Sequence, residues 1–303
     1  MSRSKKRPVQ KSRESTRSSR RRIVLVALVV ALLAAVAVAA ALSRGTDDET
    51  AEPGPVHVHG LGVNPADGAL FIATHTGLFR AAEGESKAVR VGEDFQDTMG
   101  FTIVGPDRFL GSGHPDLRQE LPPLLGLIES TDAGESWKQV SLLGAADFHT
   151  LRFAHGRVYG YDVTNDRLLV SRDEGRTWDE LARPGPVFDL VIDPTDPQHL
   201  FAAAQSQLGP ALFESRSGGE SWRAAASLAG LLAWPARDEL YVVTAGGEVF
   251  VTPDGRHLEL RGRTGGEPAA FLADGRDLYI ALHDGTIERS SDGGRRWEIR
   301  SAP

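Results

Sequence analysis

The feature that most constrains the fold of this 303-residue chain is a motif that recurs about every 41 residues. The motif reads Ser-x-Asp-x-Gly-x-x-Trp, and its four clear or near copies end at Trp137, Trp178, Trp222 and Trp297. The longest interval, between Trp222 and Trp297, contains a degenerate copy of the motif at residues 252–255. Repetition of short strands with this period is typical of β-propellers, in which each repeat forms one blade.

Each residue type in the motif suits a tight turn between two strands. Ser and Asp side chains hydrogen-bond the backbone of such turns, and Gly accepts the positive φ that they require. The Trp ring supplies a large apolar surface for packing. We therefore predict a structural role for Ser130, Asp132, Gly134 and Trp137; for Ser171, Asp173, Gly175 and Trp178; for Ser215, Gly219 and Trp222, with Ser217 in the place of Asp; and for Ser290, Asp292, Gly294 and Trp297.

These segments resemble the Asp-box, or BNR, repeats of the sialidase-like and sortilin-like propellers, among them a bacterial family labelled as sialidase-like glycosyl hydrolases. The resemblance covers residues 56–303. It implies an all-β propeller with an Asp-box turn between the third and fourth strands of a blade. The period of about 41 residues divides residues 56–303 into six repeats, and we assign one blade of four strands to each. The resemblance implies no particular activity, because enzymes and binding scaffolds, such as sortilin-like receptors and photosystem II assembly factors, share the repeat.

The strand pattern agrees with this fold. Segments rich in β-branched and aromatic residues precede the motifs at 70–73, 157–161, 240–243 and 278–281, and we expect them to be second strands. No strand before the first repeat is left over to complete the last blade, so the sequence leaves the closure of the ring open. We expect the blades to begin near residues 56, 98, 147, 187, 229 and 268.

The segment before the repeats points to a membrane. Residues 1–22 carry ten Lys or Arg and one acidic residue, and the twenty residues 23–42 are all apolar. Twenty apolar residues in a helix span a bilayer, and Lys and Arg stay on the cytoplasmic side. We predict a cytoplasmic tail, a transmembrane anchor or uncleaved signal at 23–42, a linker at 43–55 and an extracytoplasmic propeller at 56–303. The alternative is a cleaved signal peptide and a secreted protein.

Composition excludes several classes of function. From residue 23 onward the chain has 24 Lys or Arg against 40 Asp or Glu, a net charge of −16. This acidic body argues against nucleic-acid binding, which needs clustered basic groups. Because the chain has no Cys, it has no disulfide, thiolate metal site or Cys nucleophile.

Histidines gather on one face of the predicted ring. Loops that join second to third strands, and each blade to the next, lie opposite the repeat motifs, and we name this side the site face. Neutral imidazole and carboxylate suit a zinc-like divalent metal, a sugar or a peptide, but they also satisfy channel water and loop backbone. The predicted ligand-binding residues are His57, His59, His75, His114, Asp116, Asp147, His149 and His283. Among these, His57, His59 and His149 are the candidate metal ligands. Asp116 or Asp147 would be a further ligand, or would accept a hydrogen bond from a ligating histidine.

The sialidase resemblance also implies specific catalytic residues, and this sequence departs from them. That family clamps its substrate with three Arg, the first on the opening strand, but residues 56–60 contain none. Other glycosidases need only two carboxylates beside the scissile bond; the candidates are Asp97 and, on the long loop 111–125, Asp116 and Glu120. We therefore expect a scaffold that binds a glycan or a protein partner, with a glycoside hydrolase as the alternative.

Overall fold

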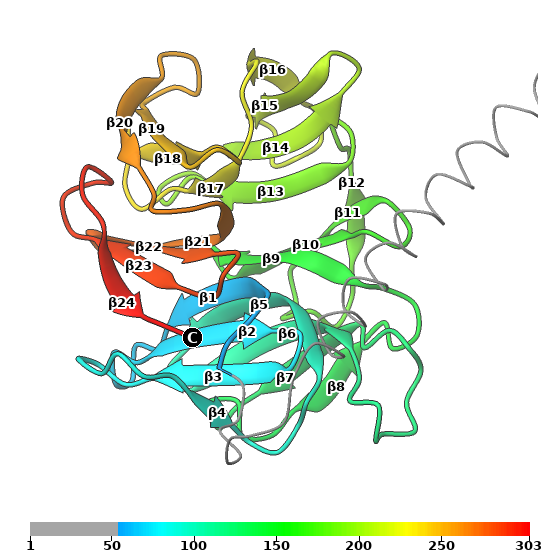
Figure 1. Cartoon of the computed structure of the whole chain (residues 1–303). Coiled ribbons are helices and arrows are strands. Elements are labelled where there is room, and N and C mark those ends of the chain that lie inside the picture. Colours follow the sequence, from blue (N-terminus) through cyan, green and yellow to red (C-terminus); the bar gives the residue numbers. More distant parts are fainter. Residues whose placement is uncertain (1–53) are drawn as a thin grey trace, which may run out of the picture. The chain divides into compact units, whose positions relative to one another are not determined.

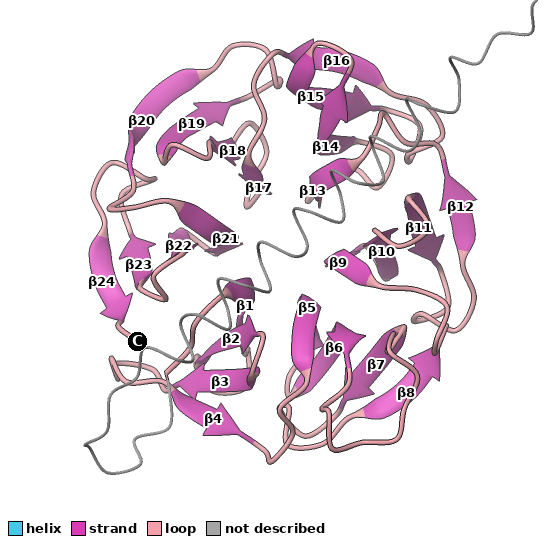
Figure 2. Cartoon of the chain, turned by 45° about the vertical axis from the view of Figure 1, so that its right-hand side comes forward, coloured by secondary structure: helices cyan, strands magenta, loops and turns pink. Residues whose placement is uncertain are grey.

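The structure, a computed structural model, describes residues 54–303, which form an all-β, six-bladed propeller. Each blade is a sheet of four antiparallel strands that follow one another in sequence, and the six blades surround a central channel (Figures 1 and 2). Every blade begins within two residues of its predicted start. The prediction of six four-stranded blades is therefore confirmed.

The strands of the first three blades run from the channel outward. They are β1 (Val58–Val63), β2 (Leu70–Thr74), β3 (Gly77–Ala81) and β4 (Val89–Val91) in blade 1; β5 (Asp97–Gly105), β6 (Arg108–His114), β7 (Leu127–Ser130) and β8 (Lys138–Ser141) in blade 2; and β9 (Phe148–Ala154), β10 (Arg157–Asp162), β11 (Arg167–Ser171) and β12 (Asp179–Leu181) in blade 3.

The last three blades repeat this order. They contain β13 (Val187–Ile192), β14 (Leu200–Ser206), β15 (Gly209–Ser215) and β16 (Arg223–Ala226) in blade 4; β17 (Leu231–Ala233), β18 (Leu240–Val243), β19 (Glu248–Thr252) and β20 (Glu259–Arg263) in blade 5; and β21 (Pro268–Asp274), β22 (Asp277–Leu282), β23 (Ile287–Ser290) and β24 (Glu298–Ser301) in blade 6.

The predicted membrane span at 23–42, the basic tail before it and most of the linker lie outside the described residues. Within residues 54–303 we find no helix with the length and apolar character that a membrane crossing requires.

The hydrophobic core lies between the blades. It consists of six apolar clusters, one for each pair of neighbouring blades, including the pair formed by the first and the last. The second strands are the most buried, as in β2, where all five residues are inaccessible, whereas the outer strand β24 is largely exposed. Burial of apolar side chains on both faces of every blade is the main force that holds such a ring together.

Blades 1 and 6 close the ring without exchanging a strand. Their shared cluster packs Val58 and Leu61 against Ala270 and Tyr279. At the rim, Lys87 forms a parallel bridge with Ala302. Arg300 of β24 donates hydrogen bonds to Ala82 O, at 2.7 Å, and to Glu85 O. The ring therefore closes by side-chain packing and a few rim contacts.

The repeat motifs form the turns between third and fourth strands, and we name them the repeat turns. In the first, Ser130 Oγ donates to Asp132 Oδ1 at 2.8 Å and accepts from Gly134 N at 2.8 Å. Asp132 Oδ1 also accepts from Ser136 N at 3.0 Å. Asp173 and Asp292 make the equivalent bonds in their own turns. These bonds hold the turn rigidly without any contact to another blade.

Other atoms of the repeat turns reach the preceding blade. Trp178 Nε1 donates to Ser141 Oγ at 3.0 Å, and Trp222 Nε1 donates to Ala182 O at 2.8 Å. Where Ser217 replaces Asp, its hydroxyl accepts from the backbone N–H four residues later, at 3.0 Å. The motif therefore combines a self-contained turn with a link between neighbouring blades.

The opposite side of the ring is the site face. There the end of the second strand, or the turn that follows it, hydrogen-bonds the connection that leads into the same blade. The contact recurs from Val163 N to Asp147 O at 3.0 Å, from Gln205 N to Pro186 O at 2.9 Å and from His283 N to Glu267 O at 3.0 Å. The predicted division into a repeat-turn face and a loop face is therefore present.

Candidate functional site

The central channel is the framework of the site. The first strands of all six blades line it, and its volume is about 690 Å³. One mouth opens on the site face, where β1, β5 and β9 begin. His59 of β1 and His149 of β9 line the channel there. Histidines predicted from two different blades thus meet at one opening.

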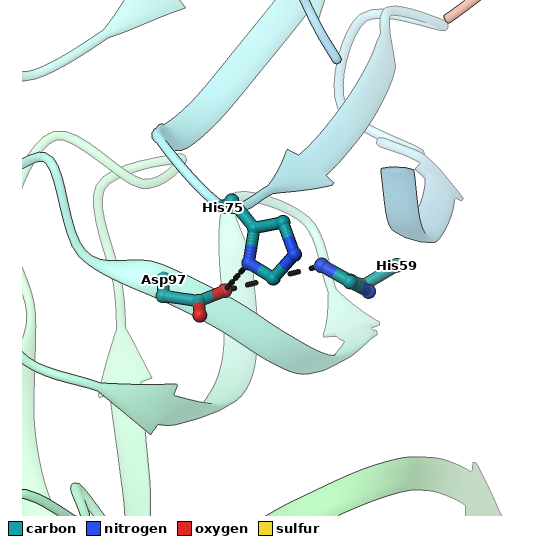
Figure 3. Close-up of side chains that lie close together, drawn as sticks. All are labelled: His59, His75 and Asp97. Atoms are coloured by element: carbon teal, nitrogen blue, oxygen red, sulfur yellow. Dashed lines mark ion pairs between the residues drawn. The ribbon is translucent and has the colours of Figure 1, made fainter. Parts of the chain in front are cut away.

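Three side chains converge beside this mouth, and we name them the His59 cluster: His59, His75 and Asp97 (Figure 3). His75 Nδ1 lies 2.8 Å from Asp97 Oδ1, and His59 Nε2 lies 3.9 Å from the same oxygen. One donor atom from each residue falls within 4.8 Å of the other two. The residues come from β1, from the β2–β3 turn and from the start of β5, so the cluster joins blades 1 and 2.

Two atoms of the His59 cluster have no hydrogen-bond partner among the described residues. These atoms are His59 Nε2 and Asp97 Oδ1, and both are buried. The side chains of His59 and Asp97 are only 20% and 22% exposed to solvent. Buried polar atoms in folded proteins are almost always paired, because an unpaired one carries a desolvation penalty. His59 Nε2 is therefore suited to bind a group from outside the chain, and Asp97 Oδ1, which forms an ion pair with His75 Nδ1 at 2.8 Å, lies 3.9 Å from it.

The environment of His59 favours its neutral form. Burial, followed by the charge of His75, lowers the pKa of His59 from 6.5 to about 4, although Asp97 acts in the opposite direction. The nearby His149 and His57 lower it further. At neutral pH the His59 ring is therefore uncharged, with a lone pair on one ring nitrogen.

This pKa shift predicts acid sensitivity of the fold. Above pH 6.5 neither folded nor unfolded His59 is protonated. Between that pH and about 4 the unfolded chain binds the proton first, so the free energy of unfolding falls as the pH falls. Urea titrations at pH 7 and pH 5 should show a loss of about 1–2 kcal/mol from this residue. His59→Gln should lose less free energy of unfolding between pH 7 and pH 5 than the wild type does. The exposed control His257→Gln should lose as much as the wild type. Equal losses in all three proteins would refute the assignment.

A second group lies on blades 2 and 3, and we name it the Asp147 cluster: Asp147, His114 and His149. Asp147 Oδ2 lies 3.0 Å from His149 Nε2 and 3.8 Å from His114 Nε2. The Asp147 side chain is only 6% exposed, and its Oδ1 has no partner among residues 54–303. His114 is held from its other side, because its Nδ1 lies 2.8 Å from Pro123 O. This cluster offers a buried carboxylate oxygen without a hydrogen-bond partner near the same mouth.

The predicted metal set is divided between these two groups. His59 is in the first cluster, whereas His149 pairs with Asp147 in the second. His57 precedes β1 with a φ of 55°, so the two-residue alternation of a strand does not apply to it. Its ring centroid lies 5.4 Å from that of His75, at the edge of the His59 cluster. The side chain of His283 makes no hydrogen bond or ion pair with another described residue.

Two predicted carboxylates lie on the loop that follows β6. Asp116 accepts hydrogen bonds from Phe95 N at 3.0 Å and from Arg118 N at 2.9 Å, besides those from the Arg118 guanidinium. The Arg118 bonds hold the pKa of Asp116 far below its usual range. Asp116 therefore anchors its own loop. Glu120 is exposed and makes no hydrogen bond or ion pair to any residue in 54–303. The loop is also shorter than expected, since β6 extends to His114.

The residues predicted from sequence for the site face were all His, Asp or Glu, and they did not include the apolar side chains that the structure exposes there. Leu117 and Leu208 are fully exposed at 101%. Among the described residues, the other exposed large apolar side chains lie on outer strands, in the channel or in site-face loops of blades 1 to 3, so the site-face loops of blades 5 and 6 carry none. A leucine between Asp116 and Arg118 in a polar loop was the available signal. The apolar set on the site face is Phe95, Leu117, Leu121, Leu143, Val163, Phe188 and Leu208.

Comparison with known proteins places the fold but no family. No model of a known protein family matches the sequence, and no curated protein matches it either. A GH74 xyloglucanase from Xanthomonas campestris shares 18% identity with a TM-score of 0.54, over 81% of this chain and 38% of the xyloglucanase chain. A chain of a nidogen–laminin complex shares 15% identity with a TM-score of 0.58, over 78% of this chain and 93% of its own.

A third solved structure, YCF48 from Cyanidioschyzon merolae, has 13% identity and a TM-score of 0.48, over 82% of this chain and 86% of its own. The present chain spans less than half the length of the xyloglucanase. At these identities the likeness concerns the fold alone: the chain is similar to the xyloglucanase and to the chain of the nidogen–laminin complex as a β-propeller.

Proposed function

We propose that this chain is a membrane-anchored, extracytoplasmic propeller that binds a protein partner or another ligand through its site face. One observation carries the proposal: the His59 cluster, the Asp147 cluster and the apolar set all lie on this face, over blades 1 to 4. A concave mouth with a few convergent polar groups, flanked by exposed apolar side chains, is typical of binding surfaces. The nidogen–laminin complex, in which a chain of this fold is found with a second protein, agrees with this in general terms.

The entry point of the chain supports a partner near the membrane. The linker at 43–55 leads into β1 on the site face, where Pro55 packs against Gly285 in the β22–β23 turn. A linker of 13 residues reaches at most about 45 Å. An anchor at 23–42 would therefore tether the propeller to the membrane through a linker of at most this length.

We further propose that the repeat turns are Asp-boxes and that the chain is a distant member of the sialidase-like and sortilin-like group. The support is the bonding that three turns share, with the Ser hydroxyl accepting from Gly and the Asp carboxylate accepting from the backbone N–H four residues later. The fourth turn keeps this pattern with Ser217.

Site-specific photo-crosslinking tests the binding surface. A photoreactive amino acid would replace Leu117 or Leu208 on the site face, or Leu260 or Ile299 on outer strands, in the full chain in its own cells. All four side chains are exposed. We expect Leu117 and Leu208 to yield the same discrete crosslinked product, and Leu260 and Ile299 to yield none. Absence of any product, or equal products from both surfaces, would contradict the proposal.

Membrane anchoring has its own test. The full chain should sediment with membranes and stay there after a carbonate wash. A variant in which a cleavable secretion signal replaces residues 23–42 should be released. A wild-type chain that is recovered in the soluble fraction and begins near residue 42 would show instead that the segment is a cleaved signal.

One observation favours the second candidate function, a glycoside hydrolase: the carboxylates of Asp97 and Asp147 both lie near the channel mouth, and Asp147 Oδ1 has no hydrogen-bond partner among the described residues. Paired carboxylates supply the acid and the base or nucleophile of glycoside hydrolysis. If this function is right, release of reducing ends from a polysaccharide panel that includes xyloglucan should disappear in Asp97→Asn and Asp147→Asn. It should persist in Asp284→Asn, a site-face control. If the wild-type chain shows no turnover, the hydrolase function is refuted and the binding function remains.

A further inference from the structure

We propose that His59, His75 and Asp97 bind one divalent metal ion of the zinc class, which links blades 1 and 2 at the channel mouth. This ligand set differs from the one that the sequence suggested, because it contains His75 and Asp97 in place of His57 and His149. The metal site goes beyond the proposed function, and only the role of the ion in binding a partner rests on that function. The binding of the ion itself can be measured without any partner.

The distances within the His59 cluster are near those of a metal site. Zinc lies about 2.0–2.1 Å from imidazole nitrogen and carboxylate oxygen, so two ligand atoms of a tetrahedral site lie about 3.3 Å apart. The His75 and His59 nitrogens lie 2.8 Å and 3.9 Å from Asp97 Oδ1. A shift of about half an ångström at each would bring these two distances to the metal-bound spacing. All three donor atoms lie within 4.8 Å of one another, and the His75 side chain is exposed.

The unpaired nitrogen of His59 gives an independent reason. His59 Nε2 faces Asp97 Oδ1 across the cluster at 3.9 Å, and it is buried without a hydrogen-bond partner in the described part of the chain (Figure 3). Asp97 Oδ1 has an ion-pair contact, with His75 Nδ1 at 2.8 Å. A cation held among the three side chains would satisfy the lone pair of His59 Nε2 and the charge of the carboxylate at once. In the absence of an ion, no group among the described residues hydrogen-bonds His59 Nε2 to compensate for its burial.

The chemistry of the donors selects the ion. Two imidazole nitrogens and one carboxylate suit zinc and neighbouring transition metals, whereas calcium and magnesium prefer ligand shells of oxygen alone. Three protein ligands leave the fourth tetrahedral position of zinc free. Because His59 lines the channel, we infer that this position faces the mouth. A carboxylate, an imidazole or a water brought by the bound ligand would complete the shell.

Zinc titration of the full-length chain, purified in detergent without a His tag, tests the site. Calorimetry and metal analysis after dialysis should give one zinc ion per chain. His59→Ala, His75→Ala and Asp97→Asn should each weaken the affinity about 100-fold or more, while the controls His283→Ala and His257→Ala should bind as the wild type does. Asp97→Asn keeps the shape of the side chain, so its fold should persist by circular dichroism.

Two results would overturn the metal site. One is a wild-type chain that retains no zinc ion at a zinc concentration of 10 µM. The other is a folded double variant, His59→Ala with Asp97→Asn, that binds zinc as tightly as the wild type does. The proposed function fails separately: a chain that binds zinc at these three residues but forms no crosslink from Leu117 or Leu208 would uphold the metal site and refute the partner surface.

Discussion

Gly175→Ala should lower the free energy of unfolding by about 3 kcal/mol, although it adds a single methyl group to a surface turn. Gly175 lies in the second repeat turn with a φ of 85°. A Cβ atom there would lie 2.1 Å from Leu127 Cδ2 in the preceding blade, and Leu127 is fully buried. The left-handed backbone contributes about 1–2 kcal/mol and the forced repacking about 1–3 kcal/mol.

Gly275→Ala separates these two contributions. Gly275 also has a positive φ, 57°, but nothing lies within 4 Å of the position that a Cβ would take. Its replacement should therefore cost only the backbone part, about 1 kcal/mol. Urea unfolding of both variants at pH 7 makes the comparison. Equal losses would mean that the repeat turn does not pack tightly on its neighbouring blade.

Removal of the Glu214 side chain should have an effect of similar size. Glu214 is fully buried at the edge of blade 4, yet it accepts hydrogen bonds from Arg216 Nε at 2.7 Å and from Arg256 Nη2 of blade 5 at 2.7 Å. Arg223 lies 2.9 Å away, and His199 Nε2 lies 3.1 Å from the same carboxylate. One acidic side chain thus holds four basic partners from two blades.

Electrostatics determine the state of this group. Burial alone would raise the pKa of Glu214, but the hydrogen bond from Arg256 and the charges of Arg216 and Arg223 outweigh burial and lower it. The group is therefore ionised in the fold. Glu214→Ala would leave the buried His199 with one partner fewer and would remove the carboxylate that the three Arg share, at an expected cost of about 3 kcal/mol.

The matched control is Glu174→Ala. Glu174 also pairs with two Arg side chains, Arg108 at 3.2 Å and Arg176 at 3.1 Å, but it is half exposed. Exposed ion pairs contribute about 0–1 kcal/mol, so this variant should unfold nearly as the wild type does. Chemical denaturation of the two variants under the same conditions compares them. A loss in Glu174→Ala as large as that in Glu214→Ala would show that burial does not control the strength of this network.

The candidate site was predicted in part. Sequence position assigned His59, His75 and Asp97 to the site face, because the order of strands and loops decides on which side of the ring a residue lies. It did not show that Asp97, considered only as a catalytic candidate, lies 2.8 Å from His75. That contact depends on how blade 2 packs against blade 1, which neither residue signals by itself.

For Asp116, the sequence suggested a functional side chain, whereas the structure shows one that is engaged within its own loop. A carboxylate in a long loop was a reasonable candidate for binding or catalysis. The structure commits both of its oxygens to Phe95 N and Arg118. Whether a loop carboxylate is free depends on the path of the loop, and that path is a matter of local packing rather than of residue type.

The sequence by itself determined the number of blades, the strands in each blade and the face on which the histidines lie. It could do so because these properties follow from short-range interactions that recur in every repeat, such as the bonds within each turn over a few residues. Only the tertiary structure decided how the ring closes and which side chains meet at the channel mouth. These depend on packing between blades, as in the bond from Arg300 to Ala82, 218 residues apart in sequence, and no local pattern encodes such a contact.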